Sequence, residues 1–367
     1  MKKMDLTGIQ IFWIIVSFQC GNTLLLTLSP NINEAQQDAW IASIIAGALG
    51  LFIAYVSTKL SLLFPGRTIV QYSQDILGKW FGKLIMIPYF IQWYSVLGVI
   101  LKEFSDFTIL TLLPRTPIWI LTITMVLLLI YITYMGGIEG IGRCSELLGP
   151  FIVIMIILIL PLNIQVMDWT RILPIYVDTG ISHIFKGALT PLSFFGEVCM
   201  LTMLVSFMKK PAEGPLRAIL GLSVACFLLM VSSLFVIMVF GPGLSAKMAH
   251  PFFDMVRFIS FGGFIENIDL VIVLIWVVSV FIKMSLYFFI SCYGTAQWLN
   301  IKNWRTLIWF IAPIILIQAW LYPDITASDI GYVTKYWIPI VLPVNMFGIP
   351  LLLWFVASIR KKYANAH

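Results

Sequence analysis

Residues 187–208 read GALTPLSFFGEVCMLTMLVSFM and carry one acidic side chain, Glu197, inside an apolar run long enough to cross a membrane. About 20 apolar residues span the roughly 30 Å hydrocarbon core of a bilayer. An ionised carboxylate near the centre of that core costs a few kcal/mol unless a partner or a water-filled cavity receives it. Pro191 and Gly196 closely precede Glu197, so we expect the helix to be interrupted at the position of the charge.

The composition of the chain excludes an ordinary soluble domain. Hydrophobic residues make up 60% of its 367 residues and charged residues 11%, whereas a soluble domain carries about 25% charged residues. The net charge of +6 does not indicate nucleic-acid binding, because the one run of three Lys or Arg is Arg360-Lys361-Lys362. The five cysteines lack the spacing of metal ligands, and we expect small buried apolar side chains there.

Apolar segments recur along the whole chain and predict an all-α polytopic membrane protein with ten transmembrane helices. Lys and Arg are more numerous on the side that holds the N-terminus, which predicts that both termini are cytoplasmic. The start resembles a signal peptide but lacks small residues at a cleavage site, so we expect a retained first span. The ten segments cover residues 8–29, 39–63, 82–103, 117–135, 147–163, 184–208, 217–240, 267–292, 306–322 and 333–357.

Five segments on each side of the chain's centre suggest an internal repeat, with residues 8–163 as the first set and 184–357 as the second. Each set begins with an interrupted segment, near residues 19–23 and near residues 190–196. Because five spans per set is an odd number, the two sets have opposite orientations, which is the inverted-repeat plan of many secondary transporters. Broken helices present free N–H groups to an anion and free carbonyls to a cation, so the site suits a zwitterionic amino acid.

Two ionisable residues lie within the predicted spans. Glu197 could receive a substrate ammonium, exchange a proton, or brace the unwound backbone by accepting its N–H bonds. Lys283 in the eighth segment is the natural counter-charge, and the alternative is that it extends to the cytoplasmic face.

In the third span, Tyr89, Trp93 and Leu97 follow one helix face and either wall a substrate pocket or pack against lipid and core. No Ser/His/Asp or Cys/His constellation indicates catalysis, so we predict no enzyme, no metal site and no cofactor.

The loop after the second segment contains a short periodic stretch. Ile69, Tyr72, Ile76 and Trp80 recur at helical spacing. This pattern predicts an amphipathic cytoplasmic helix on the membrane surface, and the alternative is a plain linker.

A series of short motifs, taken in order, resembles the B-subunit family of bacterial spore germinant receptors, the endospore germination permeases of the amino acid–polyamine–organocation superfamily. The resemblance covers essentially the whole chain. The motifs are Thr27-Leu28-Ser29-Pro30, Pro65-Gly66-Arg67 followed by Ile76-Leu77-Gly78-Lys79, Thr116-Pro117, Gly140-Ile141-Gly142-Arg143 with Glu146, and Phe195-Gly196-Glu197.

The resemblance implies a LeuT-type fold with a 5+5 inverted repeat, broken helices 1 and 6, and a pocket between spans one, three, six and eight. It implies a sensor in the inner spore membrane that binds an amino acid or related nutrient and triggers germination together with A and lipoprotein C subunits. A proton-coupled amino acid permease and an ion-conducting subunit are the alternatives. The substrate-binding residues carried over are Cys20, Gly21, Asn22, Thr23, Trp93, Leu97, Phe194, Phe195, Gly196, Glu197, Lys283 and Ser285.

Overall fold

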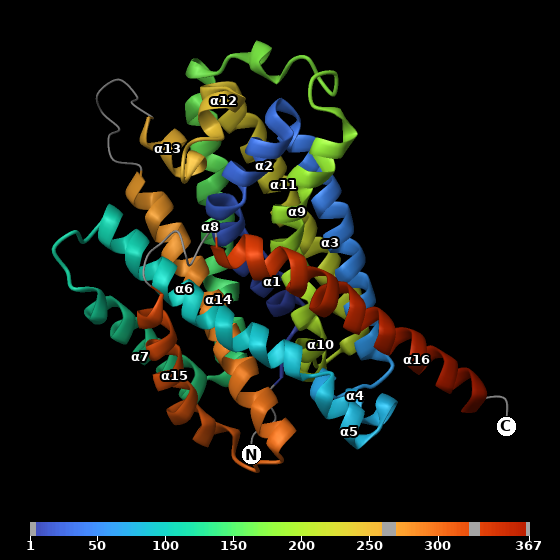
Figure 1. The fold of residues 1–367 in the computed structure, drawn as a ribbon. Coiled ribbons are helices and arrows are strands. Elements are labelled where there is room, and N and C mark those ends of the chain that lie inside the picture. The colour runs from blue at the N-terminus through green and yellow to red at the C-terminus, as the bar shows by residue number, and fades with distance from the viewer. Residues whose placement is uncertain (1–4, 259–268, 323–330, 365–367) are drawn as a thin grey trace.

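A computed structural model describes residues 5–258, 269–322 and 331–364, and this part of the chain is built from helices (Figure 1). In it, 10 helical segments are long and apolar enough to cross a membrane, as the sequence predicts. The predicted eighth segment, 267–292, begins just outside the described residues. The ten segments are Gly8–Leu26, Leu28–Leu62, Lys79–Thr111, Ile118–Met135, Gly137–Val166, Gly180–Phe207, Pro211–Phe240, Leu270–Leu299, Trp304–Leu321 and Val333–Arg360.

The first five spans and their connections run up to Ile172. Their elements are α1 (Gly8–Leu26), α2 (Leu28–Ala35), η1 (Gln36–Asp38), α3 (Ala39–Leu62), α4 (Ile69–Leu77), α5 (Lys79–Leu84), α6 (Ile87–Thr111), α7 (Ile118–Met135), α8 (Gly137–Ile159), η2 (Leu160–Val166) and η3 (Trp169–Ile172).

The last five spans start at Gly180. Their elements are α9 (Gly180–Phe195), η4 (Gly196–Met200), α10 (Leu201–Leu204), η5 (Val205–Phe207), η6 (Pro211–Glu213), α11 (Gly214–Phe240), α12 (Pro242–Ser245), α13 (Pro251–Arg257), α14 (Asp269–Leu299), η7 (Trp304–Leu307), α15 (Ile308–Leu321), η9 (Val333–Gly348, a π-helix) and α16 (Ile349–Ala364).

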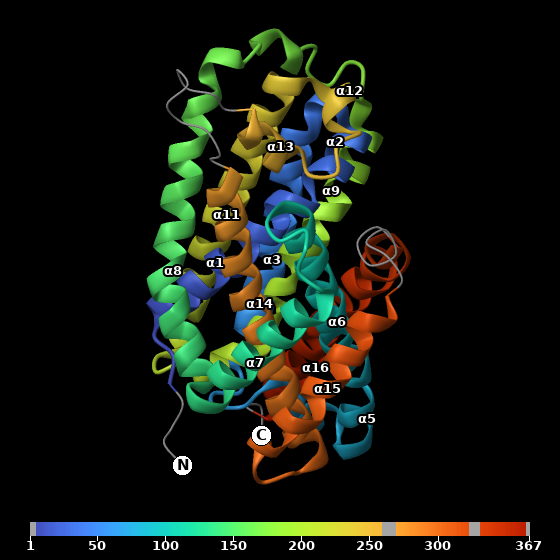
Figure 2. The same cartoon turned by 90° about the vertical axis from the view of Figure 1, so that its left-hand side faces the viewer.

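The first two spans of each predicted set of five form one bundle. Helix α1 packs on α11, and α3 packs on both α9 and α11. Glycines allow this close approach, because a Cβ atom at Gly50 would lie 2.8 Å from the Cβ of Phe195 and one at Gly47 would lie 3.0 Å from Cys226. Helices α8 and α14 pack on α1, and α6 packs on α14 and α15 (Figure 2).

Short helices lie at two opposite ends of the molecule (Figure 1). The α12 end carries α2, α12 and α13, and the α4 end carries α4, α5 and the start of α1 (Figure 2). The midplane between the two ends contains the point at which α9 passes into η4.

The first predicted interruption is not where the sequence pattern puts it. Helix α1 runs through residues 19–23 without a break, and the helical path is interrupted at Thr27, before α2 begins. The reason is that Gly21 and its neighbours are buried among other helices. A break there would leave backbone N–H and C=O groups buried without partners, which is costly, whereas a continuous helix keeps them paired.

The second interruption lies where the sequence predicts it. The α-helix ends at Phe195 and continues as a 3₁₀-helix over Gly196–Met200, which carries Glu197 in its first turn. A 3₁₀ segment in the middle of a long helix is typical of functional hinges.

The predicted surface helix after α3 is two helices with a bend between them. Gly78 adopts φ +85°, a conformation that favours glycine, and separates α4 from α5. The predicted apolar face is therefore divided: Tyr72 and Ile76 are buried in the core, and Trp80 is 85% exposed. The expectation of one amphipathic helix with this face on the membrane surface is wrong, because three of the four residues, Ile69, Tyr72 and Ile76, pack inward.

Candidate functional site: a buried ion pair at the broken sixth span

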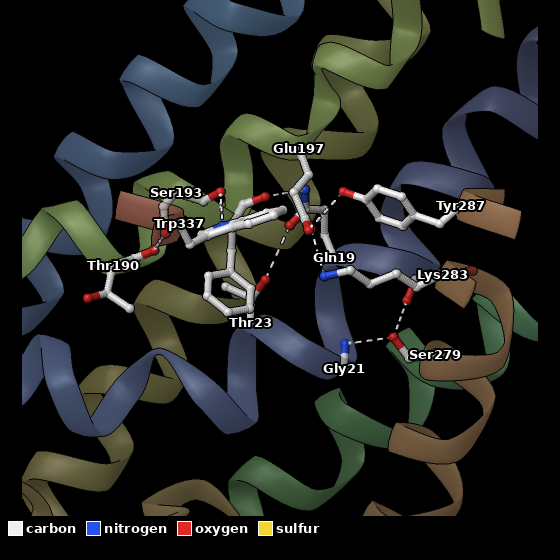
Figure 3. A network of polar contacts seen from close by, with 12 residues as sticks. Gln19, Gly21, Thr23, Thr190, Ser193, Glu197, Ser279, Lys283, Tyr287 and Trp337 are labelled. Carbon is white, nitrogen blue, oxygen red and sulfur yellow. Dashed lines mark hydrogen bonds and ion pairs between the residues drawn. The ribbon is translucent and has the colours of Figure 1, made fainter. Parts of the chain in front are cut away.

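The centre of the site is an ion pair between Glu197 on η4 and Lys283 on α14 (Figure 3). The Lys283 Nζ atom lies 2.7 Å from Glu197 Oε2, and both residues are only 1% exposed. The hydroxyl of Tyr287 donates a hydrogen bond of 3.1 Å to Glu197 Oε1. Lys283 therefore points inward as the predicted counter-charge, and the alternative that it extends to the cytoplasmic face is wrong.

Helix α14 directs a polar stripe at this site. Ser279, Lys283 and Tyr287 are four residues apart, which places them on one helix face. Ser279 and Tyr287 are absent from the predicted site, although their spacing from Lys283 was a signal that could have identified them. Ser285, which was predicted, donates its hydroxyl to the Phe281 carbonyl of its own helix at 2.7 Å.

The passage from α9 to η4 frees carbonyl groups, and side chains from distant spans bind them. Gln19 Nε2 donates to the Phe194 carbonyl at 3.0 Å, and Trp337 Nε1 donates to the Ser193 carbonyl at 3.1 Å (Figure 3). The ring of Phe194 also lies beneath the Lys283 ammonium, with 5.2 Å between Nζ and the ring centroid. This distance allows a cation–π interaction in addition to the ion pair.

In the equivalent region of α1, one hydroxyl group of α14 binds two backbone groups of the unbroken helix. Ser279 Oγ accepts a hydrogen bond of 3.0 Å from the Gly21 N–H and donates one to the Ser17 carbonyl. Ser17 and Gly21 are the donor–acceptor pair that one α-helical turn would join directly, so the Ser279 hydroxyl bridges that turn. A Cβ atom at residue 21 would lie 2.3 Å from both the Cβ and the Oγ of Ser279, which explains why a glycine is needed here.

Three further predicted residues of α1 are buried beside this turn. Thr23 donates to Gln19 Oε1 at 3.2 Å, so it helps to orient the side chain that binds the Phe194 carbonyl. Asn22 is 1% exposed, and its Oδ1 atom has no hydrogen-bond partner among the described residues. Cys20 is 2% exposed.

Four predicted residues are not brought to the ion pair. Phe195 and Gly196 lie on the other side of the broken span, against Gly50 of α3 and Met346 of η9. Trp93 packs against Gly294, eleven residues beyond Lys283 and thus about 16 Å along α14. Leu97 is fully buried on α6, one turn from Trp93.

A cavity of about 670 Å³ opens near the site at the α12 end. Its wall includes Leu26, which follows the polar residues of α1, and Thr190, which precedes those of α9. His250 also lines it, with Nδ1 3.3 Å from the Leu25 carbonyl oxygen and its ring packed edge-on against Phe107. Burial lowers the pKa of His250, so this side chain favours its neutral form.

At the α4 end, the start of the chain pairs with the end of the sixth span. The Leu6 N–H donates to the Phe207 carbonyl at 2.7 Å, and the Lys209 N–H donates to the Leu6 carbonyl at 2.9 Å. These bonds form a parallel bridge between Leu6 and Met208, just after the sixth span. Gln10 adds a hydrogen bond of 3.2 Å to Glu146 on α8.

Comparison with known proteins gives relatives across the whole chain. The sequence is 26% identical to spore germination protein YndE of Bacillus subtilis (strain 168), over 97% of this chain and 97% of the relative. It is 25% identical to spore germination protein KB of the same organism, over 99% of this chain and 97% of the relative.

Solved transporters share the fold. A mutant of the Eremococcus coleocola manganese transporter superposes on 96% of this chain and 76% of its own, with a TM-score of 0.57 and 12% identity. Mhp1, a nucleobase-cation-symport-1 family transporter, superposes on 97% of this chain and 90% of its own, with a TM-score of 0.55 and 11% identity. At these identities the likeness shows the fold alone, which is the predicted LeuT type.

A sequence model of the family described as "Spore germination protein" matches residues 5–327. This match covers most of the chain and agrees with the two relatives and with the ten apolar spans. The chain therefore belongs to the spore germination protein family, the germinant receptor B-subunit family that its motifs resemble.

Proposed function

We propose that this protein is the nutrient-sensing B subunit of a spore germinant receptor and that it binds an amino acid at the Glu197–Lys283 pair. The observation that carries the proposal is this pair of buried opposite charges beside the broken sixth span. The ammonium of an amino acid matches Glu197 and its carboxylate matches Lys283. A ligand that takes the place of both partners keeps each ion compensated, so neither charge is left buried alone.

The backbone around the pair supports the same ligand class. The carbonyls of Ser193 and Phe194 are bound by side chains, and a ligand ammonium competes for such groups more readily than for bonds inside a helix. We propose Gly21, Asn22 and Thr23 as the wall formed by α1. The ring of Phe194 then contacts the ligand side chain and contributes to selectivity.

Ligand access and signalling follow from the two ends of the molecule. The cavity lies at the α12 end, where Leu26 and Thr190 line it, and the Leu6 bridge lies at the α4 end. We propose that the ligand enters through the cavity and shifts the angle between α9 and η4. A ligand moves such an equilibrium only through its different affinities for the two states. The A and C subunits then read the change.

The proposed setting is the inner membrane of a spore, with both termini in the cytoplasm. An even number of candidate spans supports two termini on the same side, and the excess of Lys and Arg on that side supports the cytoplasm.

Ligand binding to the purified protein tests the proposal. Each of the twenty amino acids is added and thermal unfolding is followed, because a ligand of the native state raises the unfolding temperature. The amino acid that stabilises the wild type should lose at least about tenfold in affinity in Gly21→Leu and in the double variant Glu197→Gln/Lys283→Met, equivalent to about 1.4 kcal/mol. The matched control is Glu139→Gln, which removes a carboxylate from a surface pair with Arg143 on α8. An unchanged panel in the first two variants would exclude the site.

A proton-coupled amino acid permease is the second candidate. The arrangement that favours it is an open cavity at one end and a closed bridge at the other, as alternating access requires. Proteoliposomes that contain this chain alone distinguish the two functions. Uptake of the labelled amino acid driven by a pH gradient would indicate a permease. Binding without uptake would indicate a receptor subunit.

A further inference from the structure

A groove of about 590 Å³ lies in the wall of the molecule between α6, α14 and α15, away from the ion pair. One stripe of α6 forms its floor, from Ile87 through Ile91 to Ser95, at the four-residue spacing of a helix face. Trp298 of α14 forms its side near the α4 end. The groove lies within spans long enough to cross the membrane, so its open side faces lipid.

The lining of the groove suits hydrocarbon. Ile87 is 39% and Ile91 is 53% exposed, which is the expected state of apolar side chains that contact lipid. The hydroxyl groups of the wall are bonded within the protein: the Tyr94 hydroxyl lies 2.7 Å from Thr295 Oγ1, and Ser95 Oγ lies 2.8 Å from the Tyr332 hydroxyl. Gln318 also lines the groove, and its buried Oε1 atom has no hydrogen-bond partner among the described residues. An acyl chain can therefore lie along this wall without burying these hydroxyls unpaired.

A positive charge stands at the mouth of the groove. Lys83 precedes Ile87 by one turn, and its Nζ lies 5.5 Å from the ring centroid of Trp298. The Trp298 Nε1 in turn donates to the Lys83 carbonyl at 3.0 Å. Among the described residues no carboxylate forms an ion pair with Lys83. Trp and Lys at the end of a span are typical of the headgroup region, where basic side chains attract anionic lipids.

The length of the groove matches one leaflet. Twelve residues separate Lys83 at the end of α5 from Ser95 on α6, which corresponds to about 18 Å at the rise of a helix. Half of the hydrocarbon core of a bilayer is about 15 Å. A lipid whose phosphate lies at Lys83 thus reaches the middle of the membrane with its acyl chain at Ser95.

We propose that this groove is a binding site for one anionic phospholipid, with its phosphate at Lys83 and an acyl chain along α6 between Ile87 and Ser95. The lipid contacts α6 and α14 together and so stabilises their packing. The proposal does not depend on the proposed ligand of the ion pair.

Quenching of Trp298 fluorescence by brominated lipids tests the proposal. The full chain is placed in nanodiscs that contain brominated phosphatidylglycerol or brominated phosphatidylcholine. The signal of Trp298 among the 13 tryptophans is the difference between the wild type and Trp298→Phe. We expect the anionic lipid to be preferred about fivefold, the effect of one basic residue near the surface.

Two lysine variants decide the outcome. Lys83→Gln should remove the preference for the anionic lipid, and Lys79→Gln should keep it, because Lys79 is an exposed lysine one turn earlier on the same helix. Equal quenching by both lipids in the wild type would overturn the proposal, and so would a preference that survives in Lys83→Gln.

Discussion

The two interrupted spans of this protein satisfy their backbone groups in different ways. Span one remains an α-helix through Gly21, where the Ser279 hydroxyl binds both the Gly21 N–H and the Ser17 carbonyl. Span six leaves the α-helix at Phe195, and side chains from α1 and η9 bind its free carbonyls. In both cases the partner is a side chain of another span. Both arrangements therefore depend on how the spans are packed, and a movement of span one alters the Gln19 bond to span six.

The largest expected effect is at the buried charges of span six. Lys283→Met leaves Glu197 without its counter-charge at 1% exposure, which should cost about 3–5 kcal/mol of folding free energy. The double variant Glu197→Gln/Lys283→Met removes both charges and should recover most of that loss. Thermal unfolding of the purified variants measures both effects. A Lys283→Met protein as stable as the wild type would show that the pair does not hold span six in place.

A methyl group added at Gly21 of span one and at Gly196 of span six compares how tightly the two spans are packed. At Gly21 the new Cβ would lie 2.3 Å from the Cβ of Ser279, which cannot move without its helix. At Gly196 it would lie 2.3 Å from the Met346 sulfur, which belongs to a flexible side chain. Gly21→Ala should therefore cost about 3 kcal/mol and Gly196→Ala about 1 kcal/mol.

The compensating variant checks this explanation. Ser279→Gly removes the Cβ that Gly21→Ala would meet, so the double variant should be more stable than Gly21→Ala alone in thermal unfolding. Equal costs at the two glycines would contradict a tighter contact in span one.

The sequence predicted those parts of the fold and site that depend on local composition. Apolar length predicted the ten spans, and Gly196 beside a buried acid predicted the break in span six. The roles of Ser279 and Trp337 could not be predicted, because they depend on where α14 and η9 cross the broken spans. For the same reason the distance of Trp93 from Lys283 could not be predicted: its helix face can be read from the sequence, but the level at which α6 meets α14 cannot.

Removing one hydrogen-bond donor from each span compares how much stability span six and span one lose without their partner side chains. Trp337→Phe leaves the Ser193 carbonyl buried without its donor and should cost about 1–2 kcal/mol. Ser279→Ala should cost less, about 0.5 kcal/mol, because α1 can close the turn between Ser17 and Gly21 by itself. Thermal unfolding gives the two costs, and amide hydrogen exchange at Gly21 reports whether the turn has closed. The opposite order would mean that span one needs its partner more than span six does.

The smallest expected effect is a pH dependence at the end of α1, where His250 contacts the Leu25 carbonyl. Burial lowers the pKa of His250, and the Leu25 carbonyl and Asp254 oppose this shift only in part. Because the folded pKa lies below the unfolded value of about 6.5, the native state binds fewer protons than the unfolded state between the two values. The stabilisation is thus complete above about pH 6.5 and declines as the pH falls toward the folded pKa.

Thermal unfolding between pH 7.5 and 5 should show this decline in the wild type and a flatter profile in His250→Gln. The control is His183→Gln, whose side chain is 56% exposed near Glu34 and should leave the profile unchanged. If His250→Gln keeps the full decline, the interruption of span one at Thr27 does not respond to protonation of His250, and the pH dependence belongs to another part of the molecule.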